Sequence, residues 1–483
     1  MRDVVFQFTE FGSIQDLTLG LQWSAADFAS QVRKRAAALV QAGIEPHSIV
    51  MIAHSGSAHF FADLFAVWEC GCTAACIDPA LTQNEIGTLL DFVQPTAVVV
   101  SEAQIDASIG AQVFNLSQSF SSVERTVAMP AGDPNRPALI LFTSGTTGSP
   151  KGVVLTFRAV LARIALNQAA MGGIGKMRTL VTLPTSFGHG LIGNALTPLL
   201  SGGDLVLHPL GLPMAQNLGG IIDEYGIGFL SSVPSFWRMA LKFSNAPATD
   251  ALARVHVGSA PLSARLWTEI AEWSRAEVIN CYGITELANW VCGASSKVDG
   301  IGDGLVGKPW GAAVAIRNST GVVHKVGEGE LLVQSPSVMS GYLHRPDLTA
   351  AAFVDGWYCT GDLGSISNDR SIRLAGRLKD EINRAGHKIQ PAEIDALIEG
   401  HPAVAEVCVF GMNDVASGEI VAAAVRLLPG QHVSIEALRQ WCSTRVHREA
   451  VPERWFVIDK IQKNDRGKVD RAAVRKSLCG GLQ

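Results

Sequence analysis

The sequence predicts an α/β protein in which layered sheets of parallel strands alternate with helices. Strand-like runs alternate with helix-like segments over residues 1–135, and the same β-then-α alternation returns from 178 to 262. The 483 residues suggest two or three domains, and 47% hydrophobic with 17% charged residues describe a globular chain with an ample core. Residues 390–483 have a separate, compact α+β pattern. We therefore expect a large α/β unit followed by a small α+β unit.

Charge and composition exclude several classes of protein. The formal net charge of -5 gives no electrostatic reason to expect a nucleic-acid partner. No apolar run reaches membrane-spanning length, and the first ten residues carry charges where a signal peptide would need an apolar core. The nine cysteines lack the density of a disulfide scaffold. The sequence thus favours a reduced, cytoplasmic protein with no nucleic acid and no membrane insertion.

Three of the cysteines, Cys70, Cys72 and Cys76, cluster in the apolar stretch AVWECGCTAACIDPAL. Free cysteine behaves as a small hydrophobic residue, so core filling is the favoured interpretation. A metal site is the alternative.

The elements are predicted in order from caps and apolar periodicity. Helices are expected at Ser24–Ala42, Ser57–Cys70, Phe157–Ala170, Ala392–Ile398 and Ile435–Val446, the last capped by Ser434. Strands are expected at Ser48–Ala53, Thr96–Val100, Ala138–Phe142, Leu180–Leu183, Asp204–Leu207, Phe229–Val233, Val404–Val409 and Ile420–Leu427. A further strand begins at Arg254 and runs into a turn of small residues, Gly258 to Ala260.

The segment from Thr143 to Gly152, TSGTTGSPKG, has the composition of a phosphate-binding loop. Its glycines let backbone N–H groups approach an anion, its hydroxyls add donors, and Lys151 adds a compact positive charge. It is not the common GxxxxGK[ST] nucleotide loop. A flexible surface turn is the alternative, but ordinary turns seldom need ten such specialised residues.

This loop resembles, at every fixed position, the phosphate loop of the adenylate-forming superfamily. That family contains acyl- and aryl-CoA synthetases, adenylation domains and firefly luciferase, and the resemblance covers essentially the whole chain. It implies a large N-terminal domain for ATP and acid, residues 1–378, and a small mobile α+β C-terminal domain, residues 379–483. It implies phosphate contacts from Thr143, Ser144, Gly145, Thr146, Thr147, Gly148 and Lys151.

Three later motifs resemble the family's ATP site. The turn Gly258-Ser259-Ala260 would lie against adenine. In VINCYGITEL, which matches the family's YGxTE motif, Tyr282, Gly283 and Thr285 would bind the nucleotide, while Glu286 together with Thr146 would hold Mg²⁺. Asp362 of the TGD motif is expected at a strand end, where it would accept the ribose hydroxyls. Each motif alone would be read as an ordinary turn.

The C-terminal motifs imply the catalytic and hinge residues. The segment from Lys460 to Arg471, KIQKNDRGKVDR, resembles the family's P-K-x-x-x-G-K motif, with Gln462 in place of the usual proline. Lys468 would then be the catalytic lysine. By position in the family's GRxxD segment, Arg377 would contact ribose or phosphate and Lys379 would be the hinge. The segment around Gly386 would give the thiol access after a domain swing.

The acid pocket is expected around Phe187, Gly188 and His189. In the family, the position of Phe187 lies near the substrate carboxylate, and amino-acid activators place an Asp at the position of Gly188. No Asp or Glu occurs from Thr179 to Gly203, so a buried α-ammonium would be unpaired and an amino acid is disfavoured. His189 and Asn194 could contact an oxygenated or aryl acid, and a structural role is an equal alternative for both.

These motifs together predict an enzyme that activates a small carboxylic acid with ATP and Mg²⁺. The acid would become an acyl-adenylate with release of pyrophosphate, and would then pass to the thiol of CoA. The close alternative is transfer to the phosphopantetheine of an acyl carrier protein. A non-catalytic nucleotide-binding homologue is less favoured, since Lys468, Glu286 and the loop are all present. A light-emitting oxygenase has no positive sign in the sequence.

Overall fold

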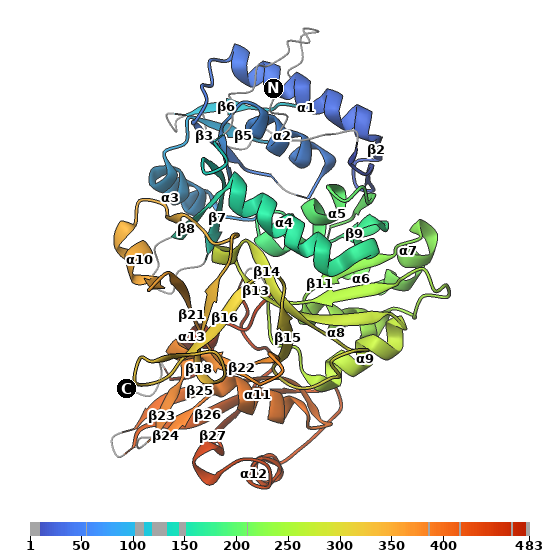
Figure 1. Cartoon of the computed structure of the whole chain (residues 1–483). Helices are drawn as coiled ribbons and strands as arrows, with labels where there is room; N and C mark the ends of the chain where they lie inside the picture. The colour runs from blue at the N-terminus through green and yellow to red at the C-terminus, as the bar shows by residue number, and fades with distance from the viewer. Residues whose placement is uncertain are drawn as a thin grey trace.

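The computed structural model describes residues 10–54, 56–101, 111–117, 133–143, 151–209, 211–384, 387–414, 417–464 and 467–479. These residues form three sheets with helices packed on them (Figure 1). The N-terminal elements, blue in Figure 1, lie at the top of the view, and the C-terminal elements, orange to red, lie at the bottom. The α/β class with a large and a small sheet-containing part is therefore confirmed.

The largest sheet has fifteen described strands, some paired parallel and others antiparallel. Its strands are β1 (Ile14–Asp16), β2 (Leu21–Trp23), β9 (Thr179–Val181), β10 (Leu205–Leu207), β11 (Phe229–Ser232), β12 (Arg254–Val257), β13 (Glu277–Ile284), β14 (Asn289–Ser295), β15 (Leu305–Pro309), β16 (Ala313–Arg317), β17 (Val323–His324), β18 (Gly327–Gln334), β20 (Phe353–Val354), β21 (Trp357–Ile366) and β22 (Ile372–Arg377). Strands β10, β9, β11, β12 and β13 run parallel, and from β14 onward the neighbours are antiparallel. The expectation of parallel layers thus holds for only part of this sheet.

Two smaller sheets complete the described fold. The seven-stranded sheet contains β3 (Ile49–Ile52), β4 (Thr73–Cys76), β5 (Ala97–Val99), β6 (Gln112–Phe114), β7 (Pro137–Thr143), β8 (Lys151–Thr156) and β19 (Gly341–Tyr342). The five-stranded sheet of the C-terminal part contains β23 (Ile382–Arg384), β24 (His387–Ile389), β25 (Val404–Asp414), β26 (Gly418–Leu427) and β27 (Arg454–Val457).

Several helices begin at a polar side chain that caps their first turn. Ser24 caps α1 in a capping box with Asp27, and Ser57, Thr156 and Ser434 cap α2, α4 and α12. The α-helices are α1 (Ala25–Gln41), α2 (Ala58–Glu69), α3 (Gln83–Val93), α4 (Phe157–Met171), α5 (Thr197–Leu199), α6 (Leu212–Gln216), α7 (Leu218–Tyr225), α8 (Pro234–Phe243), α9 (Ala264–Ser274), α10 (Pro346–Ala351), α11 (Pro391–Glu399), α12 (Ile435–Ser443) and α13 (Arg471–Cys479). Shorter turns are η2 (Gly172–Lys176), η4 (Thr285–Leu287), η5 (Leu378–Asp380), η6 (Arg448–Ala450) and the π-helix η3 (His189–Leu196).

The predicted phosphate loop joins two antiparallel strands. Strands β7 and β8 pair with Thr143 directly opposite Lys151, so both ends of the loop are fixed at one point of the sheet. Helix α4 begins only after β8, where the sequence placed a helix at Phe157.

The three clustered cysteines of the N-terminal part of the chain fill the core, as predicted. Cys70, Cys72 and Cys76 are 3%, 0% and 1% exposed and belong to the main apolar cluster. Burial raises the pKa of the Cys72 thiol to about 11, so these thiols stay protonated and unreactive.

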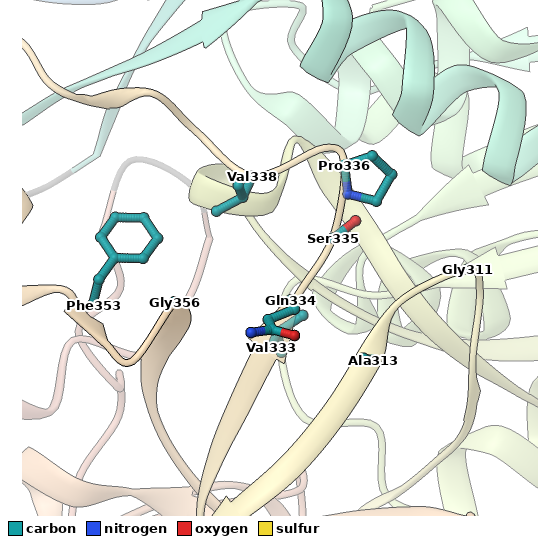
Figure 2. A pocket seen from close by; sticks show the side chains of 9 residues that line it. All are labelled: Gly311, Ala313, Val333, Gln334, Ser335, Pro336, Val338, Phe353 and Gly356. Atoms are coloured by element: carbon teal, nitrogen blue, oxygen red, sulfur yellow. The ribbon is translucent and has the colours of Figure 1, made fainter.

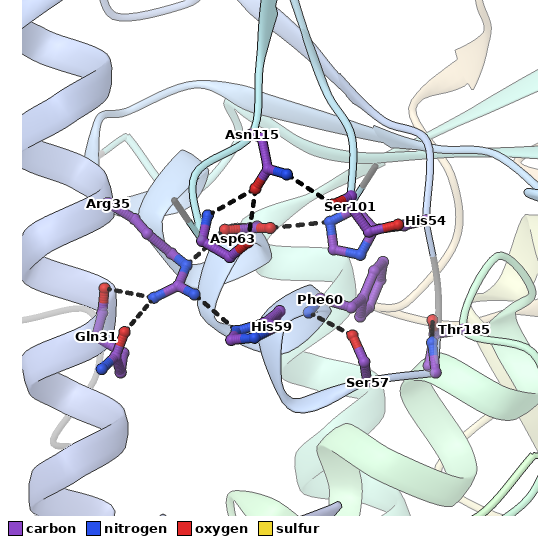
Figure 3. Close-up of polar contacts among 12 residues, drawn as sticks. Gln31, Arg35, His54, Ser57, His59, Phe60, Asp63, Ser101, Asn115 and Thr185 are labelled. Atoms are coloured by element: carbon purple, nitrogen blue, oxygen red, sulfur yellow. Dashed lines mark hydrogen bonds and ion pairs between the residues drawn. The ribbon is translucent and has the colours of Figure 1, made fainter. Parts of the chain in front are cut away.

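A buried ion network joins α1, α2 and the end of β3 (Figure 3). Arg35 Nε donates to Asp63 Oδ1 at 2.7 Å, and His54 Nε2 lies 2.8 Å from Asp63 Oδ2. All three side chains are at most 5% exposed. The adjacent backbone N–H of Gly56 donates to Thr185 Oγ1 at 3.0 Å. This hydrogen bond connects the segment before α2 to the segment that precedes the predicted acid pocket.

Candidate active site

The predicted adenine turn follows β12 and contacts the predicted acid pocket. Ser259 has a φ of 68°, in the left-handed region, and its Oγ lies 2.7 Å from His189 Nδ1. The other ring nitrogen, Nε2, lies 2.7 Å from Ser231 Oγ on β11. A side chain at Gly258 would meet the carbonyl oxygen of Cys281 at 3.0 Å, so the turn packs closely on β13.

His189 is an uncharged dipole between these two hydroxyls. Burial, with a smaller effect from the positive charge of Lys468, lowers the pKa of His189 to about 3. One ring nitrogen therefore donates and the other accepts at neutral pH. His189 also begins the π-helix η3, and π-helical turns occur frequently at functional sites.

Tyr282, Asp362 and Arg377 form a second group. Tyr282 donates its hydroxyl to Asp362 Oδ2 at 2.6 Å, and Arg377 Nε donates to Asp362 Oδ1 at 2.8 Å. Burial raises the pKa of Asp362, and the nearby charges of Arg377, Lys468 and Lys379 oppose that shift. Burial and the Asp362 carboxylate raise the pKa of Tyr282, so its hydroxyl stays protonated and donates.

The position expected for Asp362 is wrong in one respect. We expected a strand end, but β21 continues to Ile366, and Asp362 lies in its interior opposite Arg377 of β22. Gly361, with φ 69°, and a register shift after Leu363 distort the ladder at this point. The irregular strand turns the carboxylate toward Tyr282 without ending the strand.

Glu286 forms a third group beside the phosphate loop. It lies in the turn η4, and its Oε1 accepts the hydroxyl of Tyr342 at 2.9 Å. Lys151 Nζ lies 5.7 Å from the centroid of the Tyr342 ring. The carboxylate predicted to hold the metal is therefore next to one end of the predicted phosphate loop. Ser144, Gly145, Thr146, Thr147 and Gly148 lie outside the described residues.

Arg377 connects the second and third groups electrostatically. Desolvation opposes its charge, but Asp362, then Tyr282 and Glu286, raise the pKa of the guanidinium above its ordinary value. Gly283 and Thr285 lie between Tyr282 and Glu286 at the end of β13 and the start of η4. A Cβ at Gly283 would lie 2.0 Å from the carbonyl oxygen of Asn289, so only glycine fits there.

Lys468, in the C-terminal part of the chain, acts electrostatically on this site. Its charge lowers the pKa of both His189 and Asp362, which places it within electrostatic reach of the first two groups. Its backbone N–H donates to Asn464 Oδ1 at 3.1 Å, and the adjacent Gly467 has a φ of 70°. A Cβ at Gly467 would lie 3.2 Å from Ser235 Oγ of α8, so this loop touches the large part of the molecule.

The predicted hinge lies where the chain passes between sheets. Strand β22 belongs to the large sheet, β23 to the five-stranded sheet, and the turn η5 with Lys379 joins them. Arg238 of α8 pairs with Glu399 of α11 across the two parts. Gly386 lies outside the described residues.

The glycines of the acid segment have different roles. A Cβ at Gly188 would meet only Leu141 Cδ1, at 3.6 Å, so this position has room for a side chain. At Gly190 and Gly193 a Cβ would lie 2.2 Å from Pro184 O and 2.0 Å from Asn289 Nδ2, so both permit close packing. Asn194 donates to the carbonyl of Leu180 at 3.2 Å, which supports its structural alternative.

Sequence reasoning missed Ser231 and Tyr342, which position His189 and Glu286. Both lie on strands that carry no recognisable catalytic or binding motif. Each contacts its partner only because the fold brings together residues that are far apart in the sequence. For Tyr342 one signal existed, because it closes the GE…GY strand segment from 327 to 342 that was interpreted as structural.

The structure also contains an open pocket of about 500 Å³ (Figure 2). It is lined by Gly311, Ala313, Val333, Gln334, Ser335, Pro336, Val338, Phe353 and Gly356. None of these is a predicted site residue, and the lining carries no charged side chain. We therefore assign the site from the three residue groups above and not from this pocket.

Comparisons with known proteins agree with the motifs. A model of the AMP-binding enzyme family matches residues 12–343, and a model of the AMP-binding enzyme C-terminal domain matches residues 393–468. An oxalate–CoA ligase of Arabidopsis thaliana is 29% identical, with 92% of this chain and 91% of the ligase covered. A fatty acid–[acyl-carrier-protein] ligase of Streptomyces coeruleorubidus is 31% identical, with 92% of this chain and 89% of that ligase covered.

The fold matches solved structures over nearly its full length. The o-succinylbenzoate coenzyme A synthetase of Bacillus subtilis, in complex with ATP and a magnesium ion, superposes with a TM-score of 0.86 at 24% identity. The match covers 97% of each chain. Within the part of the chain that the structure describes, no helix combines the length and apolarity needed to span a bilayer.

Proposed function

The chain belongs to the AMP-binding enzyme family, and from this premise we propose that it is an AMP-forming ligase that joins a carboxylic acid to CoA. The carboxylate attacks the α-phosphorus of ATP, the bond to pyrophosphate breaks, and an acyl-adenylate forms. The thiol sulfur of CoA then attacks the acyl carbon, loses its proton, and displaces AMP. The observation that carries this proposal is that the loop of Gly467 and Lys468 packs on Ser235 of α8 and that the charge of Lys468 acts on both His189 and Asp362.

The first half-reaction needs charge stabilisation more than acid–base chemistry, because the carboxylate is already ionised. In our proposal Lys468 bridges the carboxylate and the α-phosphate. Residues Thr143 to Lys151, including Ser144, Gly145, Thr146, Thr147 and Gly148, bind the outer phosphates with backbone and hydroxyl donors. Asp362 and Arg377 hold the ribose, and Tyr282 with the turn from Gly258 to Ala260 holds adenine.

Glu286 and Thr146 would hold Mg²⁺. A carboxylate and a hydroxyl are the hard oxygen ligands that this ion prefers, and Tyr342 fixes the Glu286 carboxylate beside Lys151. When bound, the ion neutralises phosphate charge.

The second half-reaction uses the same pocket after a domain movement. We take residues 1–378 as the large domain and 379–483 as the small one, with Lys379 as the hinge. Rotation about the hinge would withdraw Lys468 and bring the segment around Gly386 toward the thiol path. The single turn η5 between the two sheets supports this assignment.

A second candidate acceptor is the phosphopantetheine arm of an acyl carrier protein. The observation that favours it is the 31% identical relative named for a carrier protein. CoA remains the leading acceptor, because other relatives that cover most of the chain are named as CoA ligases.

The test is a pyrophosphate-exchange screen over a library of carboxylic acids, followed by separate assays with CoA and with a phosphopantetheine-loaded carrier protein. Exchange that depends on an acid, and thioester formation with CoA, are expected. If none of the acids in the library supports pyrophosphate exchange, the proposed function is rejected. Thioester formation only on the carrier protein would reject CoA in favour of the second acceptor.

A further inference from the structure

The interior beside His189 contains buried polar atoms that the protein leaves without hydrogen-bond partners. These are Trp290 Nε1, Asn289 Nδ2 and both ring nitrogens of His256, among the described residues. Trp290, Asn289 and His256 are 2%, 5% and 0% exposed. We call these three residues the indole cluster. Buried polar groups are nearly always satisfied, so four such atoms in one cluster require an explanation.

The indole cluster lies directly against the proposed acid site. The Trp290 ring packs edge-on against His189, with centroids 5.4 Å apart, and against His256 at 4.7 Å. A Cβ at Gly193 would lie 2.0 Å from Asn289 Nδ2 and 2.9 Å from Trp290 Cζ2. The π-helix that His189 begins therefore packs directly on the Asn289 amide and the edge of the indole.

The backbone at the cluster is strained. Asn289 has a φ of 120° and the preceding Ala288 has a φ of 59°. Positive φ values of this kind cost conformational energy for residues other than glycine. Such strain is concentrated at functional sites. The strained pair directly follows η4, so the same turn that presents Glu286 also sets Asn289 and Trp290 against the acid site.

Strand geometry gives the depth of the cluster below the reaction centre. His256 lies on β12, and Gly258 follows directly after the end of this strand and donates its backbone N–H to the carbonyl of Ser232 at 3.2 Å, so the two residues are two extended positions apart. Two residues of strand correspond to about 7 Å, which an extended acid of roughly four or five carbons would span. Beyond His256, the rings of Phe229 and Trp310 lie 4.9 and 5.8 Å from the imidazole and close the site.

Two arginines near the cluster already have other partners. Burial lowers the pKa of His256 well below its ordinary value, so the ring is neutral. Arg254 is paired with Glu277 at 2.6 Å. The guanidinium of Arg163 donates to the hydroxyls of Ser335 and Ser337 and to the carbonyl of Trp310. A second carboxylate on the acid would therefore be buried without a counter-charge, at high cost.

We propose that the acid activated here is short and carries an uncharged oxygen at its far end, bound by Trp290, Asn289 and His256. This inference rests on the proposed function and names the substrate class of the same site. Trp290 and Asn289 supply donors, and the neutral imidazole of His256 can donate or accept. A hydroxyl can accept from Trp290 and Asn289 and donate to one ring nitrogen of His256, whereas an alkyl end would satisfy none of these atoms.

The first test is a pyrophosphate-exchange comparison on the wild-type enzyme with matched acids. The probes are 4-hydroxybutanoate, its isostere pentanoate, the dianion succinate and the longer octanoate. We expect kcat/KM for 4-hydroxybutanoate to exceed the other three by about tenfold or more, because unsatisfied or uncompensated buried groups are costly. Equal rates with pentanoate, or higher rates with succinate or octanoate, would overturn the inference.

Two substitutions of Trp290 separate its size from its N–H group. Trp290→Phe keeps a ring but removes the donor, so the preference for 4-hydroxybutanoate over pentanoate should fall several-fold while octanoate stays poor. Trp290→Ala opens the site, so kcat/KM for octanoate should rise by about tenfold. Trp273→Phe, a tryptophan of α9 that donates to Ser244, is the control and should change neither preference. Unchanged specificity in Trp290→Phe would remove Trp290 from the proposal.

The failures of the two proposals are distinguishable. Absence of exchange with every acid in a broad library rejects the ligase function itself. Exchange that is strong but prefers long, unsubstituted or doubly charged acids leaves the ligase function standing and rejects only the short oxygenated substrate.

Discussion

The residues that define the reaction centre hold one another in fixed charge states. His189 is neutral between Ser231 and Ser259, while Asp362 is held between the Tyr282 hydroxyl and the Arg377 guanidinium. With a neutral dipole and a paired carboxylate beside it, Lys468 is the cation that would meet the incoming carboxylate and phosphate in the proposed reaction. The electrostatic arrangement therefore suits an anionic substrate that brings no ammonium group.

The first prediction at this scale concerns amino acids. Gly188 stands where an acidic residue would pair an α-ammonium, and no Asp or Glu occurs from Thr179 to Gly203. Free α-amino acids should therefore give pyrophosphate exchange at least about tenfold weaker than the corresponding deaminated acids. The same exchange assay checks both series, and an amino acid as the best substrate would show that this interpretation of the pocket is wrong.

The second prediction concerns the pH dependence of stability. His189 has a folded pKa of about 3, below its ordinary value of 6.5, so only the unfolded chain gains the proton between these values. The native state is thus destabilised by about 1.4 kcal/mol per pH unit as the pH falls from 6.5 toward 3.

Urea unfolding between pH 6 and pH 4 measures this slope. His189→Gln should lose less free energy of unfolding per pH unit than the wild type, and His324→Gln, an exposed histidine of β17, should match the wild type. Equal slopes for His189→Gln and the wild type would mean that His189 is not the buried neutral group described here.

At the scale of elements, the buried ion network stabilises the packing of α1, α2 and the end of β3. Asp63 is its only carboxylate among the described residues, and it bonds both Arg35 and His54. Asp63→Ala would leave the Arg35 charge buried without its anion, at a cost of about 3–5 kcal/mol. Thermal unfolding should show a large fall in Tm. The exposed Asp347→Ala, which breaks a pair with Arg345, is the control and should leave Tm nearly unchanged.

The hinge prediction also belongs to this scale. Lys379 lies in η5, which must change backbone direction for the small domain to rotate. Proline fixes φ at about -65° and removes a donor, so Lys379→Pro should restrict rotation from the conformation seen here, in which the charge of Lys468 acts on His189. Single-turnover kinetics should show an adenylate burst followed by slow thioester formation. Normal turnover would place the hinge elsewhere.

The sequence predicted elements where local signals are strong and missed those set by distant pairing. Ser24, Ser57 and Ser434 predicted three helix starts, because an N-cap side chain bonds to a backbone N–H in the first turn of its own helix. The antiparallel part of the large sheet was not predicted, because β15 pairs with β22 although many residues separate them in the sequence. No local sequence signal indicates this pairing or that of β21 with β22. The interior position of Asp362 and the roles of Ser231 and Tyr342 were missed for the same reason.

At the scale of the whole molecule, the proposed site draws its residues from two parts of the chain. The large part supplies His189, Asp362 and Glu286, and the C-terminal part supplies Lys468. The Arg238–Glu399 pair and the contact of Gly467 with Ser235 hold the two parts in this arrangement. The order of motifs along the sequence predicted both parts, because each motif is local, but not the contacts between them.

The central claim is that Lys468 serves the first half-reaction and is withdrawn for the second. Lys468→Ala is the most direct test, with Lys460→Ala, an exposed lysine of the same segment, as the control. Pyrophosphate exchange should fall in Lys468→Ala by roughly two to three orders of magnitude, because the transition-state charge loses its cation. Thioester formation from supplied acyl-AMP and CoA should stay near the wild-type rate. An equal loss in both assays would contradict the account.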